Sequence, residues 1–167
     1  MAVDMFLEFS SGDAIEGETK DKVKAAKKAI DILAWSWGMS QSGSFHIGGG
    51  GGSGKANIQD VSFTKYVDSA SAALMMACLK GTHLTEAILT VRKAGDNPLE
   101  YIVITMKKII VSSVSTGGSG GEDRLTENVT LNFAEVDFSY QEQAAKGAAQ
   151  GPAKTVKWNI EENATAS

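Results

Sequence analysis

The longest regular pattern in this sequence is an alternation of apolar and polar side chains between Arg124 and Tyr140. Successive side chains point to opposite faces of a β-strand, so the alternation predicts one long strand. The apolar residues up to Phe133 occupy one phase, and those from Val136 onward occupy the other. This switch predicts a β-bulge or a bend near Ala134. A strand of this length makes a β-rich fold the first expectation.

Shorter segments with similar patterns complete a mostly antiparallel β-barrel or sandwich with one helix. The other predicted strands are Met5–Phe9, Ile30–Met39, Asn57–Tyr66, Leu84–Lys93, Leu99–Val114 and a last strand around Val156 and Trp158. Apolar residues recur at one-turn spacing in Ser71–Leu79, which predicts the helix, and Gly81 fits the position after its end. The polar, Lys-rich segment Ser10–Ala29 fits either a short exposed helix or a long edge loop. With 167 residues, we expect a single domain, 1–167, with an extended loop at 41–54 and a short tail at 159–167.

The predicted strand Ile30–Met39 has two different faces. One face carries Leu33, Trp35, Trp37 and Met39, and the other carries Ile32, Ala34, Ser36 and Gly38. Two tryptophans bury a large area, so we expect their face to lie in the core. The predicted core residues are Trp35, Trp37, Phe63, Leu131 and Phe133. The opposite face is then exposed, with Ser62 and Thr64 beside Ala34 and Ser36, and it lacks the Lys and Glu of an ordinary surface.

Composition and charge narrow the functional class. The formal net charge is -4, from 16 basic and 20 acidic residues, which excludes a broad footprint for nucleic acid. Cys78 is the only cysteine, so no internal disulfide forms. The N-terminus lacks the basic and apolar regions of a cleavable signal peptide, and no apolar run reaches the length of a membrane span. We therefore predict neither nucleic-acid binding nor membrane insertion.

Two apparent catalytic motifs carry little weight. Gly49–Lys55 satisfies the spacing of a phosphate-binding loop, but Ala56 stands where Ser or Thr would hold magnesium, and a strand pattern follows. Cys78 with His46 or His83 is a formal nucleophile–base pair, although a lone Cys between apolar residues of a helix usually packs as a small hydrophobe. We predict no catalytic, metal or cofactor site, and hence no enzyme.

The strand Leu99–Val111 is apolar on both faces, which predicts cover on both sides and points to self-association. Two functions from other classes stay open at this point. One is a monomeric or dimeric β-sandwich that binds a ligand on a concave aromatic patch, and the other is a hydrolase that uses Cys78.

Three stretches resemble the haemolysin-coregulated protein (Hcp) family of bacterial type VI secretion. They are Ile32–Ser44, then Val61–Tyr66 together with Leu74–Cys78, and the long run Val111–Phe133. A run as long as the third is hard to match by chance. The resemblance covers nearly the whole chain and is weakest in Ser10–Ala29 and after Gln141.

The resemblance implies a compact antiparallel β-barrel of two sheets with one α-helix, assembled into a hexameric ring. It further implies that rings stack head to tail into a tube that carries a spike protein (VgrG) at its tip. A contractile sheath surrounds and expels the tube, and small effector proteins are sheltered in the lumen of some members. The protein would then be made in the bacterial cytoplasm and secreted without a cleavable signal peptide.

Two sets of residues receive roles from this resemblance. The small, uncharged face is expected to line the lumen and contact effectors through Ala34, Ser36, Ser62 and Thr64. The extended loop is expected to reach a neighbouring ring through Ser44, Phe45, His46, Gly50 and Lys55.

Overall fold

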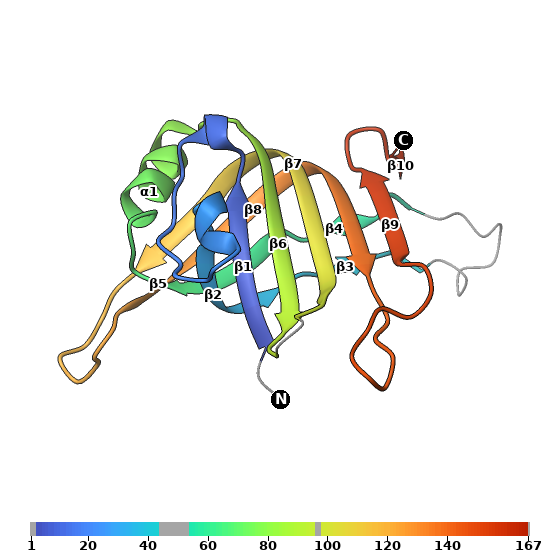
Figure 1. The fold of residues 1–167 in the computed structure, drawn as a ribbon. Coiled ribbons are helices and arrows are strands. Elements are labelled where there is room, and N and C mark those ends of the chain that lie inside the picture. The colour runs from blue at the N-terminus through green and yellow to red at the C-terminus, as the bar shows by residue number, and fades with distance from the viewer. Residues whose placement is uncertain (1–2, 44–53, 96–97, 167) are drawn as a thin grey trace.

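The computed structural model describes residues 3–43, 54–95 and 98–166. Its strands are β1 (Val3–Phe9), β2 (Ile30–Ser36), β3 (Met39–Ser40), β4 (Asn57–Ile58), β5 (Val61–Tyr66), β6 (Leu84–Lys93), β7 (Glu100–Thr116), β8 (Thr126–Tyr140), β9 (Lys154–Asn159) and β10 (Ala164–Thr165). The α-helix of the described residues is α1 (Ser71–Lys80), and short 3-10 helices occupy Ser11–Asp13 and Lys24–Lys27. The mainly-β prediction with one helix is therefore confirmed (Figure 1).

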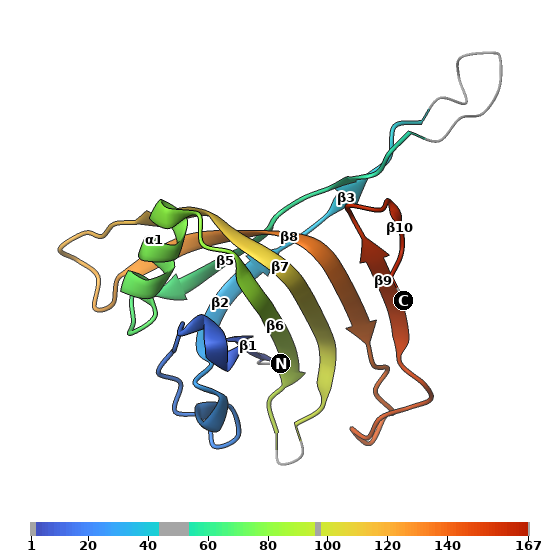
Figure 2. The ribbon, with the colours of Figure 1, turned by 90° about the horizontal axis from the view of Figure 1, so that it is seen from above.

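Six strands close into an antiparallel barrel in the order β8-β5-β2-β1-β6-β7, and β7 pairs with β8 to complete the circle. β7 lies along the whole length of β8, from the pair Thr116–Glu127 to the pair Ile102–Tyr140. The other edge of β8 is shared, because Thr126–Leu131 pairs with β5 and Glu135–Tyr140 pairs with β9. The strand therefore belongs to the barrel in its first half and to an added β8–β9–β10 sheet in its second half (Figures 1 and 2).

The interior of the barrel is filled by apolar side chains. Leu7, Val61, Leu89, Ile104 and Leu131 are fully buried members of one core cluster. α1 packs against β7 at one end of the barrel, and it contributes Leu74 and Ala77 to the same cluster. Gly81 ends the helix with a φ of 63°, a conformation that glycine adopts without strain. Because side chains occupy the interior, a channel can only form outside the single barrel.

The phase switch predicted for the long strand is confirmed. Phe133 and Val136 are both buried although they are three residues apart. β8 keeps one register with β7 on both sides of Ala134, so the strand bends and does not bulge there. Opposite the bend, Lys108 has a left-handed φ of 55°. Figure 2 shows the pronounced curvature of β7 and β8.

The assignment of the two faces of β2 was partly wrong. Ile30 and Ile32 are buried, whereas Leu33 is 39% exposed. A register shift between Ile32 and Ala34 accounts for the difference, because it lets residues on both sides of the shift point inward. Met39 is also exposed, since the predicted strand breaks after Ser36 and resumes as β3. β3 and β4 form a separate two-stranded hairpin that extends away from the barrel (Figure 2).

The fold adds detail to three other predicted segments. Within one chain, β7 is covered on one face only, because Val103 and Ile110 on its outer face are half-exposed. The tail is not free, since Ala164 and Thr165 pair with β9 as β10. The segment 10–29 is a loop with two short 3-10 turns, in which Lys24 is buried.

Candidate functional site

The sheet formed by β2, β5 and β8 carries an uncharged segment on its outer face. Pairing places Ala34 beside Thr64 and Ser36 beside Ser62. The same rows continue onto β8 and β7, where they add residues that sequence reasoning did not single out: Asn128, Thr130, Ser113 and Ser115. Directly paired residues point to the same side of a sheet, so all eight share one face. We call this set the polar wall: Ala34, Ser36, Ser62, Thr64, Asn128, Thr130, Ser113 and Ser115.

Side-chain hydrogen bonds run across the polar wall. The Thr64 hydroxyl donates to Asn128 Oδ1 at 2.7 Å. The hydroxyls of Ser113 and Thr130 are 2.5 Å apart, and Ser112 approaches Thr130 at 2.8 Å. Ala34 and Ser36 are exposed at the β2 edge of the wall. Two pairs of wall side chains, Thr64 with Asn128 and Ser113 with Thr130, thus satisfy each other with short, uncharged groups.

Two charged residues of the same strands lie on the opposite face, inside the barrel. Lys65 and Glu127 are paired across β5 and β8, and both side chains are fully buried. Lys65 Nζ lies 2.5 Å from Glu127 Oε1, 2.8 Å from Asp68 Oδ1 and 3.2 Å from the hydroxyl of Ser71. This cluster ties the first turn of α1 to the sheet. Burial of Lys and Glu is rare unless they are paired, as these are.

A carboxylate marks one end of the polar wall. Asp60, in the turn before β5, accepts hydrogen bonds from Ser112 Oγ at 2.7 Å and from Asn132 Nδ2 at 2.9 Å. At the other end, the Arg124 guanidinium lies 3.7 Å from the centre of the Tyr66 ring. The neutral surface is therefore bounded by charged residues at its two ends.

The residues assigned to the core occupy two environments. Phe63, Leu131 and Phe133 are 4% exposed or less. Trp35 and Trp37 are half-buried and pack against the core cluster from its edge. The Trp37 indole donates to the carbonyl of Gln59 at 3.0 Å and lies beside Phe133 and Phe138.

Most residues assigned to the stacking loop, namely Ser44, Phe45, His46 and Gly50, lie outside the described residues. Lys55 is exposed next to the start of β4. A strand thus follows the Gly-rich motif, as expected for a sequence that only mimics a phosphate-binding loop. Cys78 is half-buried on α1, and His83 is exposed in the turn that leads to β6.

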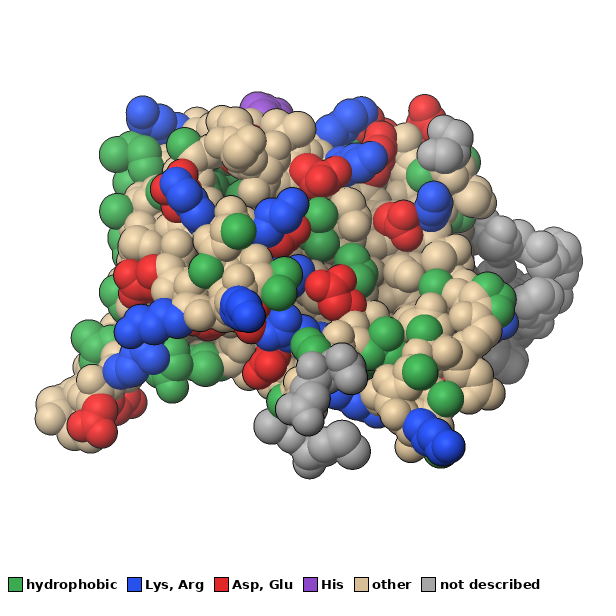
Figure 3. Space-filling view, viewed as in Figure 1, with side chains coloured by type: hydrophobic (Ala, Val, Ile, Leu, Met, Phe, Trp, Pro, Cys, Tyr) green, Lys and Arg blue, Asp and Glu red, His purple; other side chains and the backbone are tan. Residues whose placement is uncertain are grey.

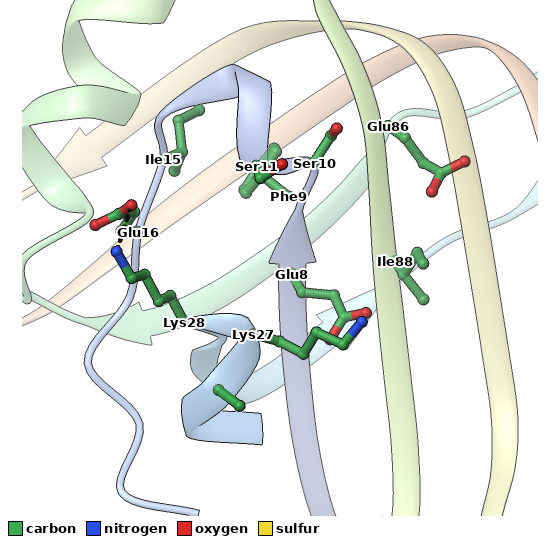
Figure 4. A pocket seen from close by; sticks show the side chains of 11 residues that line it. Glu8, Phe9, Ser10, Ser11, Ile15, Glu16, Lys27, Lys28, Glu86 and Ile88 are labelled. Carbon is green, nitrogen blue, oxygen red and sulfur yellow. Dashed lines mark hydrogen bonds and ion pairs between the residues drawn. The ribbon is translucent and has the colours of Figure 1, made fainter. Parts of the chain in front are cut away.

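The recess between β1, β6 and the segment 10–28 has a volume of about 370 Å³ and a charged lining (Figure 4). Three of its charges have partners: Lys28 Nζ is 2.7 Å from Glu16, and Glu8 is 3.6 Å from the buried Lys24. Within the described residues, no three His, Cys, Asp or Glu side chains are grouped to hold a metal ion. The recess lies on the β1–β6 side of the barrel, away from the polar wall.

Two titratable groups have shifted pKa values, and neither belongs to the polar wall. The backbone N–H of Lys24 donates to Asp21 and lowers the pKa of this carboxyl, as do Arg92 and the N–H of Val23, while burial opposes them. The hydrogen bond from Lys108 to Glu161 raises the pKa of Lys108, and the charge of Glu135 adds to it. In the described part of the chain, no helix is both long and apolar enough to cross a membrane.

A closed β-barrel with a filled interior, a neutral outer wall and a projecting hairpin defines a structural protein that acts through its surfaces. The family model "Type VI secretion system effector, Hcp" matches residues 6–140. The protein hcp1 of Pseudomonas aeruginosa is 61% identical over 167 residues, which cover 99% of this chain and 100% of that protein. The chain belongs to the Hcp family of type VI secretion.

Solved structures agree with this assignment. Hcp1 from Salmonella typhimurium is 35% identical and superposes with a TM-score of 0.76, covering 98% of each chain. A structure described as a type six secretion system protein is 26% identical, with a TM-score of 0.88 and coverage of 98% and 99%. A type VI secretion system effector from Yersinia pestis is 30% identical, with a TM-score of 0.73 and coverage of 93% and 99%. This chain is therefore a secreted tube protein of the type VI system.

Proposed function

We propose that six copies of this chain form a closed ring whose lumen is lined by the polar wall. One observation carries the proposal: where β2, β5 and β8 form the polar wall, Lys65 and Glu127 are buried beneath it and neutral residues face outward. A surface facing bulk water usually carries Lys and Glu, so this arrangement fits a surface with a special contact. Short, uncharged side chains suit a channel wall that contacts passing proteins weakly and releases them.

The proposal extends to the assembled tube. Rings stack head to tail, the spike protein VgrG sits at the tip, and a contractile sheath surrounds the tube. Small effector proteins travel in the lumen against Ser36 and its neighbours. The chain acts without catalysis, and it leaves the bacterial cytoplasm through the type VI apparatus.

The solution mass of the purified protein tests the ring. We expect the mass of six chains by light scattering, and ring-shaped particles with a central opening by negative-stain microscopy. The mass of a single chain at micromolar concentration and moderate salt would overturn the ring and favour the ligand-binding β-sandwich.

The β3–β4 hairpin is proposed to carry the stacking contact. It extends away from the barrel and leads into residues 44–53 (Figure 2). Shortening the run Gly48–Gly52 is expected to preserve rings but to weaken tubes and secretion. Normal secretion by the shortened protein would remove this role from the loop.

A further inference from the structure

Residues 20–28, in the connection between β1 and β2, lie against the outer face of β1 and β6, and we call them the strap. Apolar packing does not hold the strap there, because Val23 is 64% exposed and both Ala25 and Ala26 are exposed. Within the strap, all of which the structure describes, the one buried residue is Lys24. Figures 1 and 2 place the strap on the side of the barrel opposite the β3–β4 hairpin.

The buried contacts of the strap are ionic and polar. Lys24 Nζ lies 3.1 Å from Glu100 Oε1 on β7 and 3.6 Å from Glu8 Oε2 on β1. The same amine donates to the hydroxyl of Thr90 on β6 at 3.5 Å. A buried lysine is rare unless it is paired, so these partners explain why Lys24 can leave water. One amine of the strap thus joins three strands of the barrel.

A second ionic contact lies beside the first. The guanidinium of Arg92 on β6 pairs with Asp21 of the strap and lies 3.6 Å from Asp4 Oδ2 on β1. It also lies 4.8 Å from the centre of the Phe6 ring. Phe6 is buried although it is not a member of the core cluster, so the cover over it comes from outside the barrel. Among the described residues Arg92 Nε has no hydrogen-bond partner, which leaves this cation incompletely satisfied.

The strap and the surface beneath it carry opposite charge. The strap has five lysines and one aspartate, whereas the surface presents Asp4, Glu8 and Glu100 together with one arginine. Figure 3 shows basic and acidic side chains interleaved on this side of the molecule. The side chains of Asp4 and Glu100 are 44% and 47% exposed, so salt reaches them. Because the Debye length falls from about 10 Å at 0.1 M salt to about 3 Å at 1 M, their attraction for the strap weakens as salt rises.

The two flanks of the strap are anchored independently of these charges. Ile15 and Ile30 are buried members of the core cluster. Between them, the N–H of Gly17 donates to the carbonyl of Lys28 at 2.8 Å, which closes the base of the loop. A Cβ at Gly17 would clash with the carbonyl oxygen of Ala29, so glycine is required for this close approach. The strap can therefore detach while its base stays in place.

From these observations we infer that the strap is a salt-sensitive switch, which opens at high ionic strength while the barrel stays folded. Opening separates Lys24 and Asp21 from their partners and uncovers Phe6 on the outer face of β1. Segments with few buried apolar contacts open at a lower free energy than a packed core does. The inference is independent of the proposed ring, and it concerns the surface on the side of the barrel away from the polar wall.

Hydrogen exchange of the wild-type protein measures this opening. The N–H groups of Val23 and Lys24 donate to the carboxylate of Asp21, so their exchange reports the closed strap. We expect their exchange to become about 10-fold faster or more between about 0.05 M and about 1 M sodium chloride. The N–H of Leu89, which is fully buried in β6 beneath, should keep its rate. Equal acceleration of strap and barrel, or none in the strap, overturns the inference.

Two matched substitutions identify the contact that closes the strap. At low salt, Lys24→Gln should accelerate exchange at Val23 by about 10-fold and leave little further effect of salt. Lys28→Gln removes the same charge from the same segment, but its pair with Glu16 is exposed, so its effect should stay below about 2-fold. Equal effects of the two variants would contradict a role for the buried amine. Faster exchange throughout β6 in Lys24→Gln would show that strap and barrel open together, which also contradicts the switch.

Discussion

The two faces of the β2–β5–β8 sheet reverse the usual distribution of charge, because a charged pair is buried on the inner face and the polar wall on the outer face is neutral. The inner face combines apolar packing with a buried ion pair, as in Phe63 beside Val129 and Lys65 beside Glu127. On the outer face, the polar wall has hydroxyls and amides but no charge, as in Ser62 beside Thr130. Soluble proteins usually expose Lys and Glu, so the neutral outer face is better explained by contact than by solubility. The comparison separates residues that hold the barrel together from residues that the proposed ring would expose to its lumen.

The largest expected effect is a truncation on the inner face. Phe63→Ala should lower the free energy of unfolding by about 3–5 kcal/mol, because it leaves a cavity in a close-packed core. Urea denaturation measures this loss. Trp35→Ala should cost less, since Trp35 is only half-buried at the edge of the cluster. Thr64→Ala, one residue away on the outer face, is the control; it removes one hydrogen bond to Asn128 and should cost no more than about 1 kcal/mol. Equal losses for Phe63 and Thr64 would remove the distinction between the faces.

Removing one partner of the buried ion pair should have a similarly large effect. Lys65→Met leaves Glu127 and Asp68 without their cation, and a broken buried pair costs about 3–5 kcal/mol. The double variant Lys65→Met/Glu127→Leu removes the Lys65–Glu127 pair and should recover part of the loss in the same urea titration, because Asp68 still lacks its cation. If the single variant is as stable as the wild type, the cluster does not anchor α1 to the sheet.

A smaller effect is expected on the β1–β6 side of the barrel, where the surface is charged. Asp21 accepts hydrogen bonds from the N–H groups of Val23 and Lys24 and pairs with Arg92. Asp21→Ala should cost about 1–2 kcal/mol, as does the loss of a capping carboxylate. Because the folded pKa of Asp21 is lowered, its contribution is fully present above its unfolded pKa of about 4. It should be lost as the pH falls below that value toward the folded pKa.

Measuring unfolding at several pH values for the wild type and the alanine variant isolates the Asp21 contribution. The difference between the two proteins should shrink on acidification. A difference that is independent of pH would show that the lost packing, not the carboxylate, explains the variant. Ser36→Ala in the polar wall is the control, since no titratable group is removed there.

The smallest effect on stability, and the largest on function, is expected for Ser36→Trp. Ser36 is exposed, so stability should change by no more than about 0.5 kcal/mol and the ring mass should persist. Retention of a lumenal effector should fall, because a large side chain obstructs the neutral wall. Co-purification of the effector measures this, with Ser36→Ala as the conservative control. Unchanged retention would place Ser36 outside the effector path.

The local pattern of apolar and polar residues was enough to predict much of the secondary structure. Apolar spacing placed the helix at Ser71–Leu79, and it is observed at Ser71–Lys80. Alternation located the strands and the phase switch near Ala134, since these follow from residues that are close in sequence. The motif runs, Val111–Phe133 above all, carried the resemblance to the Hcp family that the family model and the relative from Pseudomonas aeruginosa then showed.

The sequence alone therefore determined which segments form strands and which segment forms the helix. It also determined where apolar and polar side chains alternate along the strands. Only the tertiary structure decided which phase faces inward, because a register shift at Leu33 lets both Ile32 and Trp35 point toward the core. It also decided that Lys65 is buried, since Glu127 reaches it from a strand that lies 62 residues further along the chain. Pairing between distant strands leaves no local signature, and for that reason the inner and outer faces could be assigned with certainty only after the barrel had closed.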